Sequence, residues 1–202
     1  MRIVAIREDI KDLILDAAER LLSQYGYQKM TMDALAQEVG IGKGTLYLHY
    51  KSKEEIALSH IDRIIYRILV KLQIVVHREG MDAKEKLREM LLLRVLYRFD
   101  SVQHYTESLS GLLADIRPKL LARREIHFNM EAKVFTEVLE EGKRIGQFVF
   151  QDATITAQTL ILMTNSLLPY GLPPHELGKR KDIEKKVSLI ADLLLNGLLS
   201  KI

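Results

Sequence analysis

Apolar residues recur at intervals of three and four along almost the whole chain, and no segment alternates with the two-residue period of a β-strand. Such spacing is typical of amphipathic helices and predicts an all-α protein. We expect helices at about 8–25, 32–39, 43–49, 52–78, 82–99, 102–114, 118–143, 153–168 and 182–200. The segment 169–181 holds three of the four prolines and is therefore the clearest predicted loop.

The ends of the N-terminal helices carry residues that favour helix termination and initiation. Gly26 and Gly40 can adopt the left-handed conformation that ends a helix. Thr31 is a suitable N-cap, because its hydroxyl can accept a hydrogen bond from a free backbone N–H. Ser52 and Glu55 form a capping-box pattern that opens a long helix. We therefore expect a compact three-helix unit followed by a larger helical body.

The two short helices joined at Gly40 match a helix-turn-helix, a motif whose second helix enters the major groove of DNA. The interior of the motif would be formed by Leu35, Ala36, Val39, Ile41 and Leu46. The outward face would carry Lys43, Gly44, Thr45, Tyr47 and His49. Because Gly44 lacks a side chain, the start of the second helix can approach DNA closely, where its free amides favour phosphate.

The outward residues have the chemistry that binding to a DNA duplex requires. Lys43 can reach a phosphate or a guanine edge, and Thr45 can bond a phosphate or contact a thymine methyl group. Tyr47 and His49 can donate to phosphates, and Lys53 in the next helix can hold the DNA backbone beyond the groove. The alternative interpretation is a tight helical hairpin with a solvated basic edge.

The segment "MTMDALAQEVGIGKGTLYLHYKSKEEI" (30–56), preceded by "ILDAAERLLSQYGY" (14–27), resembles the DNA-binding domain of the TetR family of bacterial transcriptional regulators. The resemblance implies a fold of about nine helices, a homodimer, and a ligand pocket in the C-terminal body. It divides the chain into a DNA-binding domain at 1–51 and a ligand-binding and dimerisation domain at 52–202. Carried over by position, the expected DNA contacts are Thr31, Lys43, Gly44, Thr45, Tyr47, His49 and Lys53.

Tyr50 stands where the family usually has phenylalanine. We expect its ring to pack inward with the hydroxyl at the rim, and we keep it among the candidate DNA-contacting residues.

The last predicted helix is apolar around most of its circumference, so it must be covered on both sides. A partner subunit would cover it, with the helix at 153–168 completing the four-helix dimer interface of the family. The candidate interface residues are Leu160, Met163, Leu167, Ile190, Leu194 and Leu198. The alternative is a central core helix within one chain.

Polar residues on the otherwise apolar helices of the body are candidates for binding a small molecule. The candidate residues are Arg94, Arg98, His104, Tyr105 and His127. For each of them the alternative is a surface position or a hydrogen-bonded core position, and the class of ligand is not indicated by the sequence.

Composition excludes several kinds of chemistry. The chain has no cysteine, which excludes disulfides, thiolate zinc sites and cysteine nucleophiles. Its six histidines have no metal-binding spacing, and "GKGT" with Gln37 does not match a phosphate-binding P-loop. We therefore predict no cofactor, no metal and no enzyme activity. The uncharged stretch 153–175 contains several threonines and Pro169, which favours a buried helix over a membrane span.

Charge is mild overall, with a net value of +3, and residues 1–60 carry eight Lys and Arg against nine Asp and Glu, a balance of −1. Affinity for DNA must therefore come from a local patch, doubled by dimerisation. The sequence as a whole predicts a cytoplasmic, ligand-responsive repressor that binds a pseudo-palindromic operator as a homodimer and is released by a small-molecule effector. An activator of the same fold and a helical protein-interaction module remain open alternatives.

Overall fold

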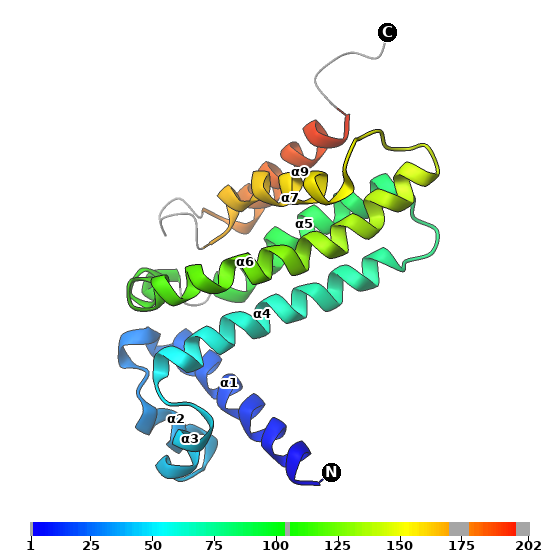
Figure 1. Ribbon diagram of the computed structural model, residues 1–202. Coiled ribbons are helices and arrows are strands. Elements are labelled where there is room, and N and C mark those ends of the chain that lie inside the picture. Colours follow the sequence, from blue (N-terminus) through cyan, green and yellow to red (C-terminus); the bar gives the residue numbers. More distant parts are fainter. Residues whose placement is uncertain (1, 104–105, 170–177, 197–202) are drawn as a thin grey trace. The chain divides into compact units, whose positions relative to one another are not determined.

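The computed structural model describes the backbone of residues 2–103, 106–169 and 178–196, and the side chains of 10–103, 112–169 and 178–196. All regular structure in these ranges is helical (Figure 1). The elements are α1 (Arg2–Lys29), α2 (Met32–Val39), α3 (Lys43–His49), α4 (Lys53–Val76), α5 (Ala83–Val102), α6 (Thr106–Arg144), α7 (Ala153–Thr164), the 3-10 turn η2 (Asn165–Leu167) and α9 (Arg180–Asn196). The prediction of an all-α protein is confirmed.

The chain forms two compact units. Residues 1–64 and 102–122 make up unit 1, and residues 65–101 and 123–202 make up unit 2. The helices α4 and α6 each contribute residues to both units. These units are defined by the contacts between residues. The predicted division between residues 51 and 52 was based on the expected roles of the two parts, and it stays a prediction.

In unit 1, α2 and α3 lie beside α1 around a small apolar core (Figure 1). Side chains buried in this core include Ile14, Ala17, Leu22, Tyr27, Met30, Leu35, Ala36, Leu46 and Ile56. The ion pairs of Arg63 add a polar connection between α4 and α1, at 2.7 Å to Asp16 and 3.1 Å to Glu19. The interior positions predicted at 35, 36 and 46 are fully confirmed, whereas Val39 and Ile41 are half-buried.

The helix ends follow the predicted caps closely. The Thr31 hydroxyl accepts a hydrogen bond from the Ala34 N–H at 3.1 Å, and Gly40 has a φ of 74° at the end of α2. The Ser52 hydroxyl accepts from the Glu55 N–H at 3.3 Å, and the carboxylate of Glu55 accepts from the backbone N–H of residue 51 at 2.7 Å. The capping box is therefore present, with its return hydrogen bond shifted by one residue.

The predicted break at Gly26 is confirmed, whereas the predicted break between residues 114 and 118 is wrong. Gly26 breaks α1 as expected, with a φ of 74° and a ψ of 169°, but helical structure resumes and continues to Lys29. The separate helices expected at 102–114 and 118–143 are instead joined in α6, which contains Pro118. Proline removes one backbone hydrogen bond from a helix, and the buried side chains of Leu112 and Ile116 hold the preceding turns in place by packing.

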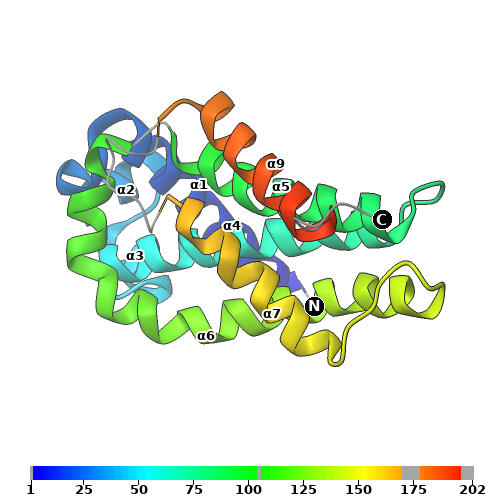
Figure 2. The same cartoon turned by 90° about the horizontal axis from the view of Figure 1, so that it is seen from above.

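In unit 2, the core lies among α5, the second half of α6, α7 and α9. Its buried side chains include Leu87, Leu91, Val95, Phe135, Val138, Leu139, Ala157, Ile161, Ile183 and Val187. α7 and α9 pack against each other (Figure 2). The uncharged segment contributes α7 to this core, and none of the described helices is long and apolar enough to cross a membrane.

We predict that Gly40→Ala lowers the free energy of unfolding by about 1 kcal/mol, because an alanine resists the left-handed backbone at this position. A β-carbon at Gly40 would meet no atom within 4 Å, so steric overlap adds nothing to this cost. Urea denaturation of the full chain measures the change. Gly40→Asn is the matched control and should lose less stability, because asparagine tolerates the left-handed region. Equal stability of the alanine variant and the wild type would contradict the prediction.

Candidate nucleic-acid interface

The orientation of α3 is set by one buried side chain. Leu46 is completely buried, and the backbone N–H of Tyr50 closes the helix by donating to the Leu46 carbonyl at 3.0 Å. Because successive residues of an α-helix are about 100° apart, the positions opposite Leu46 are Gly44 and Leu48. Both are exposed, and Leu48 exposes 84% of its surface.

The residues predicted to face DNA surround this exposed face. Lys43 and Tyr47 are exposed, and Thr45 and His49 are half-buried on the other flank of α3. All lie within one seven-residue helix. The outward set predicted from the sequence is thus accessible to a ligand, and its contacts with DNA remain a prediction.

Lys43 is already paired with an acid on the neighbouring helix. Its ammonium lies 2.7 Å from a carboxylate oxygen of Asp33 on α2, and this hydrogen bond raises the pKa of Lys43. The other acid of α2, Glu38, pairs with Arg20 on α1 at 2.8 Å. Both acidic side chains of α2 are therefore offset by cations, which weakens the repulsion that they would exert on phosphates. The ammonium of Lys43 has three N–H donors, so it can bind a phosphate while it still donates to Asp33.

Lys53 is held more firmly than a free surface lysine. Its ammonium donates to the Tyr27 carbonyl at 3.3 Å and lies 4.3 Å from the centroid of the Tyr27 ring. A cation above an aromatic face is attracted to the ring electrons, which restricts the position of the ammonium. Lys53 is half-buried, so part of its side chain remains accessible at the start of α4.

Tyr50 and Thr31 occupy structural positions. The ring of Tyr50 is buried, as expected for inward packing, and burial raises the pKa of its hydroxyl, which bonds to the side chain of Ser59. Tyr50 is therefore not presented on the exposed face of α3, although it was among the predicted DNA-contacting residues. Thr31 is exposed, and its oxygen is used to cap α2.

Leu48 was missed by the sequence analysis. Its position two residues after the anchor Leu46 places it about 200° around the helix, so the signal was present in the spacing. Because leucine is usually found in protein interiors, the exposed position of Leu48 was not predicted from its residue type. The side chain can contact the methyl group of thymine, which is the apolar group of the major groove.

The residues proposed for the body lie in several environments. Arg94 and Arg98 are buried in an ion-pair cluster, His127 is half-buried, and His104 and Tyr105 lie outside the described residues. Of the candidate interface residues, Leu160 and Leu167 are buried within unit 2 itself. Of the other candidate interface residues, Met163 is exposed, and Ile190 and Leu194 are half-buried. Leu198 lies outside the described residues.

Comparison with known proteins identifies the N-terminal domain. Residues 14–59, which include the whole helix-turn-helix, match the model of the bacterial regulatory proteins of the tetR family. These residues therefore form a DNA-binding domain of the TetR family. The chain is 27% identical over 165 residues to the uncharacterised HTH-type transcriptional regulator YhgD of Bacillus subtilis, covering 79% of this chain and 83% of that protein. The family model and this relative both describe DNA-binding transcriptional regulators, in agreement with the prediction of a regulator rather than an enzyme.

Solved structures extend the likeness to the whole fold. The fatty acid degradation regulator FadR of Bacillus halodurans has a TM-score of 0.70 at 20% identity, covering 95% of this chain and 97% of that one. The transcriptional regulator FadR of Bacillus subtilis, in complex with stearoyl-CoA, has a TM-score of 0.68 at 19% identity, covering 93% and 98%. At these identities the likeness shows that the chain shares their fold.

We predict that Gly44→Ala separates DNA binding from stability. A β-carbon at Gly44 would meet no atom within 4 Å, and alanine favours a helix, so the free energy of unfolding should stay the same or rise by up to about 1 kcal/mol. The added methyl group would stand on the face that approaches DNA, and affinity for an operator should fall about tenfold. Fluorescence anisotropy and urea denaturation measure the two quantities. If Gly44→Ala bound the operator as tightly as the wild type, the face of α3 around Gly44 would not be in contact with DNA.

Proposed function

We propose that this TetR-family protein is a cytoplasmic, ligand-responsive repressor that binds a pseudo-palindromic operator as a homodimer and leaves it when a small-molecule effector binds. The observation that carries the proposal is the exposed face of α3, centred on Gly44 and Leu48 and flanked by Lys43 and Tyr47. This face combines a close-approach position, a cation and an apolar contact, which together suit backbone positioning and base reading.

Dimerisation is supported by apolar side chains that the chain leaves exposed on α7 and α9. Leu162 exposes 60% of its surface and Leu189 exposes 61%. The other exposed apolar residues of these helices are Ile155, Met163 and Leu193. Because α7 and α9 are neighbours, a second copy can cover both helices and form a four-helix interface. We therefore place the interface on these residues, and not on Leu160 and Leu167.

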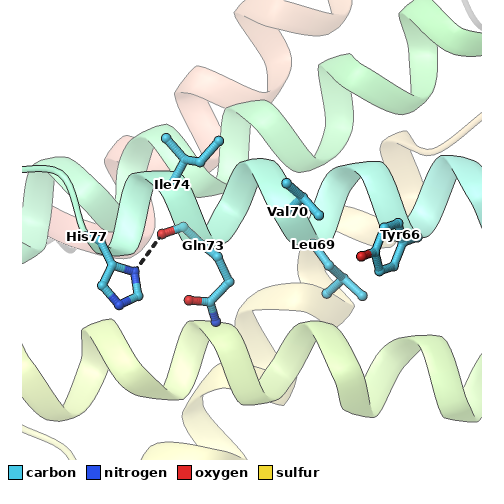
Figure 3. Close-up of a pocket in the computed structure, with 6 residues that line it drawn as sticks. All are labelled: Tyr66, Leu69, Val70, Gln73, Ile74 and His77. Carbon is cyan, nitrogen blue, oxygen red and sulfur yellow. Dashed lines mark hydrogen bonds between the residues drawn. The ribbon is translucent and has the colours of Figure 1, made fainter.

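Effector binding is supported by an apolar groove on α4. The groove has a volume of about 540 Å³ and is lined by Tyr66, Leu69, Val70, Gln73, Ile74 and His77 (Figure 3). Its lining extends over 11 residue steps of the helix, a length of about 16 Å at 1.5 Å per residue. One structural neighbour was solved with stearoyl-CoA. We propose that the effector carries a long apolar chain that lies in this groove.

The helix α4 links the proposed sites along the chain. It begins at Lys53, close after the reading helix, and it carries the groove residues from Tyr66 to His77. A ligand that favours another position of α4 would thereby alter the spacing of the two reading helices in the dimer. Such coupling is reciprocal, so effector and operator must weaken each other's binding by the same factor.

We predict that selection from random duplex DNA with the purified protein enriches two inverted copies of one half-site. The centres of the half-sites should lie about 34–36 Å or a multiple of this spacing apart, because each reading helix enters a successive major groove. Sequencing of the bound DNA gives the result. Enrichment of a single unpaired half-site would contradict the dimer, and no enrichment would contradict operator binding.

We predict that Leu162→Glu converts the dimer into monomers, because a carboxylate would be buried without a partner in the interface. Sedimentation velocity measures the change in mass. Val149→Glu is the matched control, since Val149 is 100% exposed and lies outside α7 and α9. A Leu162→Glu protein that remains dimeric would contradict the proposed interface.

A further inference from the structure

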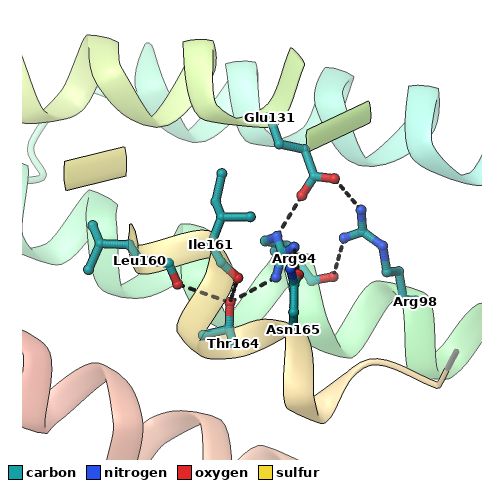
Figure 4. Close-up of polar contacts among 7 residues, drawn as sticks. All are labelled: Arg94, Arg98, Glu131, Leu160, Ile161, Thr164 and Asn165. Carbon is teal, nitrogen blue, oxygen red and sulfur yellow. Dashed lines mark hydrogen bonds and ion pairs between the residues drawn. The ribbon is translucent and has the colours of Figure 1, made fainter. Parts of the chain in front are cut away.

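A cluster of charged side chains joins three helices inside unit 2. Arg94 and Arg98 come from α5, Glu131 comes from α6, and Thr164 and Asn165 lie where α7 passes into η2 (Figure 4). Arg94, Arg98 and Glu131 are each only 2% exposed. Charged residues this deeply buried are uncommon unless they are paired.

Glu131 is shared by both arginines. Arg94 donates from Nε to one carboxylate oxygen at 2.6 Å, and Arg98 donates from Nη2 to the other oxygen. Arg94 also donates to the Thr164 hydroxyl at 2.8 Å and to the side-chain oxygen of Asn165. Arg98 donates in addition to the Arg94 carbonyl at 2.9 Å. Glu131 is thus paired with two cations at once.

Counted over the described side chains, the cluster of Arg94, Arg98 and Glu131 carries one positive charge in excess. Burial lowers the pKa of Arg94 to about 10, and the guanidinium remains charged at neutral pH. Burial alone would raise the pKa of Glu131, but the two arginines outweigh this effect, so its pKa is lowered and the carboxylate stays ionised. An excess charge in a protein interior is costly, and a buried ion pair is often no more stable than well-packed apolar residues. A contribution to folding stability therefore does not explain why two buried arginines share one carboxylate.

The guanidinium groups retain the capacity to bind an anion. Two guanidinium groups carry ten N–H donors, and the hydrogen bonds described above use five of them. A guanidinium presents paired donors in a plane, which matches the two oxygens of a carboxylate. Asn165 is half-buried and is the most accessible member of the cluster. A carboxylate that reached the arginines would neutralise the excess charge.

We propose that Arg94 and Arg98 form the recognition site for a carboxylate group, so that the effector of this protein is an organic acid. This inference rests on the proposed function, in which the body of the protein senses a small molecule. Glu131 lies on α6, the helix that contributes residues to both units, and it holds α6 to α5 through both arginines. A carboxylate that takes a share of these donors weakens this connection, which supplies a route from ligand binding to a change in α6.

The test compares octanoate with octan-1-ol, which has the same chain length but no charge. Isothermal titration and thermal melting of the full-length protein measure binding, and operator affinity is measured in the same samples. We expect octanoate to bind the wild type and raise its melting temperature, with octan-1-ol at least about tenfold weaker, the effect of losing a charge-assisted hydrogen bond. Equal binding of acid and alcohol, or no binding of octanoate, would overturn the carboxylate site.

Arg98→Gln is the decisive variant, because it leaves one arginine paired with one carboxylate. It should melt at or above the wild-type temperature while its affinity for octanoate falls at least about tenfold. Glu131→Gln adds to the excess charge, and its lowered melting temperature should be restored in part by octanoate. Arg88→Gln is the matched control on α5, where Arg88 pairs with Asp192 at 3.0 Å, and it should bind octanoate as the wild type does.

Unaltered octanoate binding by Arg98→Gln would also overturn the site. The operator measurements separate this outcome from failure of the proposed function. Octanoate that binds through the arginines without changing operator affinity would leave the carboxylate site in place and remove the sensing role. Loss of operator binding altogether would contradict the proposed regulator, whatever the result with octanoate.

Discussion

The burial of Leu46 is the constraint on which the DNA-binding surface depends. A seven-residue helix has little stability of its own, so its orientation is set by the side chain that it buries. Once Leu46 occupies the core of unit 1, helical geometry directs Gly44 and Leu48 outward. Gly40 contributes the left-handed turn that allows α2 and α3 to share this core. The reading surface is thus a consequence of packing on its opposite side.

Electrostatics refine this surface without creating it. Residues 1–60 have a balance of −1, yet acids near the surface are paired with cations: Asp33 with Lys43, and Asp16 and Glu19 with Arg63. The exposed pair of Asp33 and Lys43 contributes little to stability. The pair with Asp33 reduces the repulsion of phosphates and holds the Lys43 ammonium, at the start of the reading helix, against α2. In the proposed dimer, two such surfaces bind one operator, so that the weak affinity of each is combined.

The sequence predicted those features that depend on local spacing and failed where packing or charge balance decides. Thr31, Gly40 and the Ser52–Glu55 cap act over a few residues, so their positions could be read directly. Separate helices were expected at 102–114 and 118–143, but neighbouring apolar side chains keep α6 continuous through Pro118. The sharing of Glu131 by two arginines joins residues 33 and 37 positions apart, which no local pattern could indicate.

The central claim, that the exposed face of α3 lies against DNA, can be tested with a single thiol, because the chain has no cysteine of its own. The measurement is the rate at which N-ethylmaleimide alkylates Leu48→Cys, with and without duplex DNA that carries the selected operator. The account predicts that the operator protects this thiol, whereas Val149→Cys, at a fully exposed position in unit 2, reacts at the same rate in both conditions. Equal alkylation of Leu48→Cys in free and operator-bound protein would contradict the account.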